Sequence, residues 1–228
     1  MAVTYAFDVY GTLVNTNIIQ EALVRLVGDN APLLMDAWRS KQLEYSFRRG
    51  LMNRHIDFMV CTRQALVYCC QYYNIVLTEA EENRIMEAYQ SLPVFPEVPD
   101  VLRQLKERDI PFYAFSNGSS PAVKHLLEQA GILDLFTGVV STEAVQNFKP
   151  SPTVYKYFLD ITNTSLPNAC LVSGNSFDIL GAKSAGIKTV WVKRNVNQFF
   201  DPWGTAPDRV IRDLGELQGF PVSTVEMK

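Results

Sequence analysis

The chain lacks several features that would each indicate a particular class of protein. It has no uninterrupted apolar run of the roughly 18 residues that a membrane-spanning helix needs. Its net charge of −3 gives no cationic excess for nucleic acid or for an anionic membrane surface. The N-terminus enters an apolar stretch with no cationic segment before it, so we expect no signal peptide and a cytoplasmic location.

Cysteine and histidine are also scarce, with four and two residues in a chain of 228. Cys61, Cys69, Cys70 and Cys170 have neither the spacing of a metal site nor that of a disulfide framework. We interpret them as core residues of a protein in a reducing compartment. A hydrophobic content of 47% with 20% charged residues predicts a globular protein with a sizeable core.

Residues 14–92 have a helical pattern. Apolar residues recur at helical spacing over 18–27, 33–49, 55–73 and 79–89. Thr78 is placed to cap the last of these helices. No strand pattern interrupts them, and three prolines follow at positions 93, 96 and 99.

The rest of the chain alternates short apolar strands with amphipathic helices. We predict strands at 3–7, 111–115, 139–141, 170–172 and 188–192, and helices at 101–108, 121–130, 152–160 and 178–185. Such alternation is typical of an α/β fold whose parallel sheet carries helices on both faces. The prediction is a Rossmann-like core of residues 1–13 and 93–228, with a helical cap of residues 14–92 inserted after the first strand.

Polar, glycine-containing turns follow three of the predicted strands. These turns are Asp8-Val9-Tyr10-Gly11-Thr12, Ser116-Asn117-Gly118, and Ser173-Gly174-Asn175 with Asp178 just after it. A fourth segment holds Lys149, six residues before Tyr155. Because the carboxyl ends of parallel strands meet at one edge of a sheet, we expect these groups around one crevice. They offer a carboxylate nucleophile, a lysine that keeps it ionised, donors for an anion and a second carboxylate.

These motifs, in this order, resemble the haloacid dehalogenase superfamily, whose members share an aspartate nucleophile on the first strand. The resemblance is closest to the L-2-haloacid dehalogenases and extends to residues 205–208. Its most specific part is in the cap, where the subfamily's arginine-bearing helix is similar to Trp38-Arg39-Ser40-Lys41-Gln42-Leu43-Glu44-Tyr45. The segment 51–54 leading to Phe58 is also similar.

The resemblance implies a hydrolytic (S)-2-haloacid dehalogenase that needs neither a metal nor another cofactor. Asp8 would displace halide from C2 of a short 2-haloalkanoate and form an ester with the enzyme. Water would then cleave this ester to give a 2-hydroxy acid of inverted configuration. The implied catalytic residues are Asp8, Thr12, Arg39, Lys149, Tyr155, Ser173, Asn175 and Asp178. The implied substrate-binding residues are Val9, Tyr10, Arg39, Leu43, Phe58, Ser116, Asn117 and Phe177.

Within this set, the resemblance assigns separate tasks. Asp178, fixed by Ser173 and Asn175, would activate water. Lys149 would balance the negative charges, and Tyr155 would orient Lys149 and Asp178. Ser116 and the backbone N–H groups after Asp8 would hold the substrate carboxylate. Arg39 and Asn117 would hold the departing halide. The resemblance also implies a homodimer that forms through the cap helices.

Two other functions remain open from the residues. A magnesium-dependent small-molecule phosphatase of the same superfamily would need carboxylates at positions 10 and 174, where this chain has tyrosine and glycine. A catalytically silent binding module would not be expected to keep the costly charges of Asp8, Lys149 and Asp178 together. Phe177, Gly174 and Ser40 depart from the subfamily pattern at positions that we expect to alter the volume and polarity of the pocket.

Overall fold

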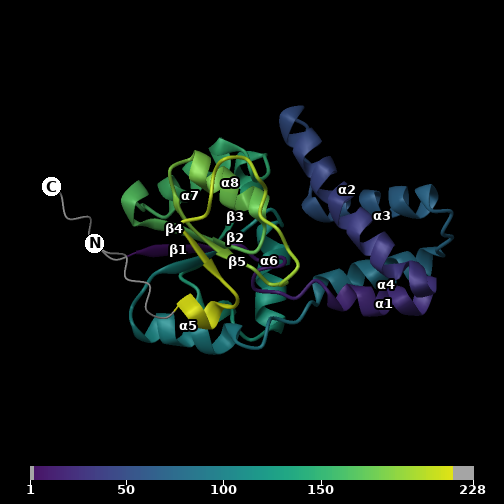
Figure 1. Ribbon diagram of the computed structural model, residues 1–228, viewed down its shortest axis with the longest axis horizontal. Coiled ribbons are helices and arrows are strands. Elements are labelled where there is room, and N and C mark those ends of the chain that lie inside the picture. The colour runs from purple at the N-terminus through teal and green to yellow at the C-terminus, as the bar shows by residue number, and fades with distance from the viewer. Residues whose placement is uncertain (1–2, 218–228) are drawn as a thin grey trace.

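The computed structural model describes residues 3–217, in which six parallel strands form one sheet (Figure 1). The strands are β1 (Thr4–Phe7), β2 (Phe112–Ser116), β3 (Gly138–Ser141), β4 (Ala169–Ser173), β5 (Lys188–Val192) and β6 (Arg209–Ile211). Their order is β3-β2-β1-β4-β5-β6. The chain adds β2 and β3 on one side of β1 and the other strands on its opposite side. The strand order therefore switches at β1, where ligands of open α/β sheets bind.

Helices cover both faces of this sheet, as the sequence pattern predicts (Figure 1). Tyr5 and Phe7 of β1 pack with the helices α5 (Val98–Glu107) and α6 (Ser120–Gln129). Ala6 points to the other face and packs with α7 (Pro152–Ile161) and α8 (Ser176–Ser184). Burial on both faces explains why the strands are apolar along their whole length. The α/β class is confirmed, and the short edge strand β6 is an addition that the pattern did not predict.

Four helices, α1 (Ile18–Val27), α2 (Ala31–Leu51), α3 (Phe58–Tyr72) and α4 (Glu79–Gln90), lie together beside the sheet, to the right in Figure 1. The cap of α4 is confirmed, because Thr78 and Glu81 form a reciprocal capping box. The helix α3 begins at Phe58, three residues later than predicted. Asp57 has a non-helical backbone there, and its Oδ1 accepts a hydrogen bond of 2.6 Å from the backbone N–H of Met59.

Short 3-10 helices complete the described secondary structure at Gly28–Asn30, Leu133–Leu135, Thr142–Val145, Leu166–Asn168 and Leu214–Leu217. No helix within residues 3–217 is both long enough and apolar enough to cross a bilayer.

Two antiparallel segments connect the four helices to the sheet. Asn15 N–H donates to the carbonyl of Pro93 at 2.8 Å, and Phe95 N–H donates to the carbonyl of Leu13 at 2.9 Å. Arg194, which follows β5, stacks on the ring of Phe95 and donates to the carbonyl oxygen of Thr12. The connection to the cap is therefore tied to the turn that follows Asp8.

All four cysteines are buried and unpaired in the described structure, which confirms their interpretation as core residues. Burial raises the pKa of the Cys170 thiol to about 12 and that of Cys70 to about 11.

Because the thiolate is the reactive form, the native protein at pH 8 should not react with Ellman's reagent within minutes. Four thiols should react after unfolding in guanidinium chloride. A thiol that reacts rapidly in the native protein would contradict this burial.

Candidate active site

Asp8 follows β1 at the centre of the sheet, and its two carboxylate oxygens have different surroundings. Oδ2 accepts hydrogen bonds from Thr12 Oγ1 at 2.7 Å, Asn175 Nδ2 at 2.7 Å and Ser173 Oγ at 3.2 Å. Oδ1 accepts only from Lys149 Nζ, at 3.2 Å, among the described side chains. Each donor draws electron density from the oxygen that it contacts. Oδ1 is therefore the oxygen of Asp8 with more capacity to attack an electrophile.

Lys149 lies between two carboxylates, and its side chain is only 1% exposed. Its Nζ donates to Asp178 Oδ2 at 2.8 Å and to the carbonyl of Phe115 at 2.8 Å, in addition to Asp8. These three contacts use all three ammonium protons. Lys149 thus compensates two negative charges that would otherwise repel each other in the interior.

Asp178 lies in the first turn of α8 and is completely buried. The expectation that Ser173 and Asn175 fix it is wrong, because their side chains contact Asp8 instead. Burial raises the pKa of its carboxyl group above the usual aspartate range, although Lys149 acts in the opposite direction. The hydroxyl of Tyr155 donates to Asp178 Oδ1 at 2.7 Å. Burial also raises the pKa of Tyr155 well above its usual value, so Tyr155 stays a donor. A carboxylate with a raised pKa is a better proton acceptor at neutral pH.

The turns after β1 and β4 are joined by hydrogen bonds and by close backbone packing. Gly174 N–H donates to Thr12 Oγ1 at 2.8 Å, and Asn175 N–H donates to Ser173 Oγ at 3.1 Å. A Cβ atom on Gly174 would lie 2.4 Å from the carbonyl oxygen of Gly11. With this backbone spacing, position 174 has no room for a side chain, and hence none for a carboxylate.

The residues at Asp8 do not fit a magnesium ion. In a phosphatase of this superfamily, the nucleophile and the backbone carbonyl two residues later would hold the cation. Here the side-chain amide of Asn175 donates to both equivalent oxygens, to Asp8 Oδ2 at 2.7 Å and to the Tyr10 carbonyl at 3.0 Å. Within residues 3–217, no group of three or more His, Cys, Asp or Glu side chains could hold a metal. An N–H donor therefore occupies the place that a hard cation would need.

The turns after β1 and β2 carry donors for an anion. Ser116 Oγ accepts from the N–H of Gly118 at 3.1 Å, which leaves its own proton for another acceptor. The backbone N–H groups of Val9 and Tyr10 have no hydrogen-bond acceptor in the described part of the chain, although both residues are buried. Buried N–H groups rarely stay unpaired, so this arrangement is suited to bind a carboxylate.

Two further donors lie on the cap and on the turn after β2. Arg39 of α2 reaches the core, where its Nη2 donates to Asn175 Oδ1 at 3.1 Å. Asn117 Oδ1 accepts from the N–H of Lys149 at 2.8 Å, so its Nδ2 stays available as a donor. The structure therefore brings a cationic and an amide donor from separate elements to the same region.

Aromatic rings form the apolar boundary of this region. The ring of Tyr10 lies 6.3 Å from that of Phe58 and 5.3 Å from that of Tyr89, between ring centres. Phe177 contacts Phe47 of α2 in an edge-to-face arrangement at 5.3 Å. Leu43 is half-buried on α2, one turn after Arg39. Of these positions, Tyr10, Leu43, Phe58 and Phe177 were expected in the pocket from the sequence, whereas Phe47 and Tyr89 were not.

Sequence reasoning also missed Arg194 and Gln42. Arg194 donates to the carbonyl of Thr12 from a position just after β5, where the pattern of polar residues at strand ends could have indicated it. Gln42 accepts a hydrogen bond of 2.5 Å from Arg39 Nη1. Gln42 lies inside the segment 38–45 that carried the resemblance. The three-residue spacing from Arg39 does not by itself indicate that the two side chains are hydrogen-bonded.

The parallel sheet and the carboxylate–lysine cluster at its switch point are those of an α/β hydrolase. The model of the haloacid dehalogenase-like hydrolase family matches residues 3–186. The chain is 33% identical over 209 residues to (S)-2-haloacid dehalogenase of Pseudomonas sp. (strain YL), covering 92% of this chain and 90% of the relative. It is 32% identical to haloacetate dehalogenase H-2 of Moraxella sp. (strain B), over 89% and 90% of the two chains.

A solved structure gives the same result. L-2-haloacid dehalogenase from Xanthobacter autotrophicus, with chloropropionic acid covalently bound, superposes with a TM-score of 0.87 at 28% identity. The match covers 95% of this chain and 97% of that chain. The chain belongs to the haloacid dehalogenase-like hydrolases, and the resemblance to the L-2-haloacid dehalogenases is confirmed.

Replacing Lys149 with methionine should destabilise the fold strongly, because it leaves two buried carboxylates without a cation. The free energy of unfolding at pH 7 should fall by about 3–5 kcal/mol. The pKa of Asp178, already raised by burial, should rise further. Between the pKa of Asp178 in the unfolded chain and its higher pKa in the folded variant, the folded variant binds more protons than the unfolded chain. The stability of the variant therefore decreases as the pH rises between these two pKa values.

Urea denaturation at pH 5 and pH 7 measures this effect. The free energy of unfolding of Lys149→Met should fall below that of the wild type by more at pH 7 than at pH 5. Lys156→Met, at an exposed position of α7, is the control and should differ little from the wild type at either pH. If Lys149→Met loses the same free energy of unfolding at pH 5 and at pH 7, the charge argument is contradicted.

Proposed function

We propose that this protein is a hydrolytic (S)-2-haloacid dehalogenase that acts on short 2-haloalkanoates through an ester on Asp8. The observation that carries the proposal is the unequal environment of the Asp8 oxygens. Oδ1 is open for attack, while three donors hold Oδ2. The names of the relatives support the substrate class, and the Xanthobacter structure with covalently bound chloropropionic acid supports a covalent intermediate.

In the first step, Asp8 Oδ1 attacks C2 of the substrate on the side opposite the halogen. The bond from C2 to Oδ1 forms as the carbon–halogen bond breaks, and the halide leaves with the bonding electrons. Displacement from the rear inverts the configuration at C2. Ser116 and the N–H groups of Val9 and Tyr10 hold the substrate carboxylate during this step.

Arg39 and the Nδ2 group of Asn117 stabilise the departing halide. A halide ion is weakly basic and needs no proton, so a cation and an amide N–H suffice as leaving-group stabilisers. Leu43, Phe58 and Phe177 exclude water from the alkyl part of the substrate and limit its size.

In the second step, water attacks Cγ of the Asp8 ester and Asp178 accepts its proton. Oδ2 is then the carbonyl oxygen of the ester, and negative charge develops on it in the tetrahedral intermediate. The donors Thr12, Ser173 and Asn175 already contact this oxygen and act as its oxyanion hole. Breaking the Cγ–Oδ1 bond releases the 2-hydroxy acid after protonation and regenerates Asp8. Lys149 balances the negative charge in both steps. It contacts Asp178, which Tyr155 holds through a second hydrogen bond.

This mechanism requires neither a metal nor another cofactor. The Asn175 amide argues against the magnesium-dependent phosphatase, because it donates to the oxygens that the cation would need. The buried ionic cluster argues against a silent binding module, because two carboxylates and a lysine are costly to bury without a chemical use.

The protein should release chloride from L-2-chloropropionate in excess EDTA and form D-lactate, whereas the D-enantiomer should be inert. Asp8→Asn should abolish chloride release, because the amide is a poor nucleophile. If chloride stays at the level of a no-enzyme control, the proposal fails. Phosphate release from aryl phosphates that depends on Mg²⁺ would favour the phosphatase instead.

A single turnover in H₂¹⁸O tests the ester intermediate. Because water attacks Cγ of Asp8, the label should enter the Asp8 carboxylate, which mass spectrometry of the peptide containing Asp8 detects. The 2-hydroxy acid from this first turnover should carry no label. Label in the product hydroxyl alone would indicate that water attacks the substrate directly.

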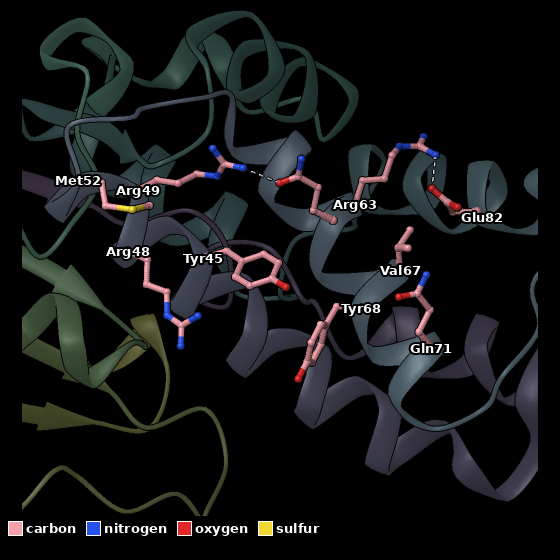
Figure 2. Close-up of a pocket in the computed structure, with 10 residues that line it drawn as sticks. Tyr45, Arg48, Arg49, Met52, Arg63, Val67, Tyr68, Gln71 and Glu82 are labelled. Atoms are coloured by element: carbon pink, nitrogen blue, oxygen red, sulfur yellow. Dashed lines mark hydrogen bonds and ion pairs between the residues drawn. The ribbon is translucent and has the colours of Figure 1, made fainter.

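We also infer a homodimer that forms through the cap. A groove of about 640 Å³ lies between α2 and α3, and none of its lining residues belongs to the Asp8 cluster (Figure 2). It is lined by Tyr45, Arg48, Arg49, Met52, Arg63, Gln64, Val67, Tyr68, Gln71 and Glu82. Aromatic and apolar side chains are exposed there or beside it, including Tyr68, Tyr72 and Met52. Glu82 of the groove already pairs with Arg63 at 2.6 Å, so the exposed aromatic and apolar side chains are the part that a second copy related by a two-fold axis would cover.

Light scattering should give the wild-type protein twice the 25.8 kDa mass of the chain. Tyr72→Glu places a charge at a side chain that is 67% exposed at the end of α3, and it should shift the protein toward the monomer. Ile161→Glu, at an exposed position of α7 on the core, is the control and should stay dimeric. A wild-type protein of 25.8 kDa in solution would exclude the dimer.

A further inference from the structure

A cluster of polar side chains is buried inside the cap, where apolar packing would be expected. At its centre is Gln42 of α2, which is 1% exposed. Its Nε2 donates to Thr62 Oγ1 of α3 at 2.6 Å and to the hydroxyl oxygen of Tyr89 of α4 at 3.1 Å. Its Oε1 accepts from Arg39 Nη1 at 2.5 Å. A buried amide is tolerated when its polar atoms are paired, and these contacts use both ends of the Gln42 amide.

The partners of Gln42 determine which way its amide points. The proton of Thr62 Oγ1 is donated to the carbonyl of Phe58 at 2.8 Å, so this oxygen can only accept from Gln42. The amide N–H₂ must therefore face Thr62, and the amide oxygen must face Arg39. Trp38 Nε1 donates to the carbonyl of Thr62 at 2.7 Å and fixes α3 against α2 at this point.

Arg39 is consequently held by two oxygens that belong to different parts of the molecule. Gln42 Oε1 holds Nη1 from the cap, and Asn175 Oδ1 holds Nη2 from the core. Asn175 in turn donates to Asp8 Oδ2. A free arginine side chain has many rotamers, and ordering it costs conformational free energy that these two contacts offset before a ligand binds.

We propose that Gln42 is a positioning residue for the leaving-group end of the site, and that Thr62 and Tyr89 are present to fix its amide. Gln42 acts through Arg39 and not on the substrate. This inference rests on the proposed dehalogenase function, in which Arg39 stabilises the departing halide. A poorer leaving group depends more on this stabilisation, so the effect of Gln42 should be larger for chloride than for bromide.

Gln42→Met tests the proposal, because methionine keeps the length of the side chain and removes the acceptor for Arg39. The rate of chloride release from L-2-chloropropionate in a single turnover should fall by about 10- to 100-fold. The loss with L-2-bromopropionate should be smaller. Gln42→Glu keeps an oxygen that accepts from Arg39 and should recover part of the rate. Equal losses for both halides, with no recovery in Gln42→Glu, would indicate a purely structural role.

Gln129→Met is the control. Gln129 is an exposed residue at the end of α6, outside the site and the groove, so the substitution exchanges the same residue types where Arg39 is not contacted. Halide release should be unchanged in this variant. In an Arg39→Met background, adding Gln42→Met should change the rate by less than about twofold, because the second residue acts through the first. Fully additive losses would overturn the proposal.

Arginine side-chain NMR tests the positioning without catalysis. In the wild-type protein, the Arg39 guanidinium, assigned with Arg39→Met, should give separate Nη signals because its rotation is hindered. These signals should merge in Gln42→Met and stay separate in Gln129→Met. If the wild type releases no halide but shows this pattern, the proposed function fails and the positioning role stands. A freely rotating Arg39 in an active wild type would overturn the role of Gln42.

Discussion

The ion pairs of Lys149 with Asp8 and Asp178 are the interaction on which the rest of the site depends. Two carboxylates and one ammonium are buried at the end of a central strand, where water cannot screen them. The cluster is stable only because each group has further partners: the Phe115 carbonyl for Lys149, Tyr155 for Asp178, and three donors for Asp8 Oδ2. The same partners leave Asp8 Oδ1 as the open oxygen, so the stabilisation of the fold and the proposed direction of attack have one origin.

Asn175 connects this cluster to the cap. Its amide nitrogen contacts Asp8 and the Tyr10 carbonyl, and its oxygen accepts from Arg39. One side chain thereby occupies the place of a cation beside the nucleophile and fixes the cationic group that would receive a halide. A metal at Asp8 would weaken a carboxylate that has to attack carbon, whereas an amide donor on Oδ2 leaves the second oxygen unaffected.

The helices α1 to α4 therefore provide part of the site, because Arg39 of α2 contacts Asn175. Arg194 stacks on Phe95 of one of the two antiparallel connections and also holds the Thr12 carbonyl beside the nucleophile. Inside the cap, Gln42, Thr62 and Tyr89 form a paired polar cluster that faces Arg39. Burying such groups costs free energy, and their full pairing makes the position of Arg39 well defined.

The sequence by itself determined the α/β class, the helices of the cap and the polar residues at the strand ends, because periodicity and turn chemistry are local properties. It also indicated Asp8 and Lys149 through the polar segments around the strand ends, and Arg39 through the resemblance. Only the tertiary structure decided that Asn175 contacts Asp8 and Arg39 together, that Gln42 faces Arg39, and that Arg194 holds Thr12. The short edge strand β6 likewise became visible only in its pairing with β5. These features depend on which strands and helices are neighbours and on which end of each amide is paired, and no spacing along the chain records that.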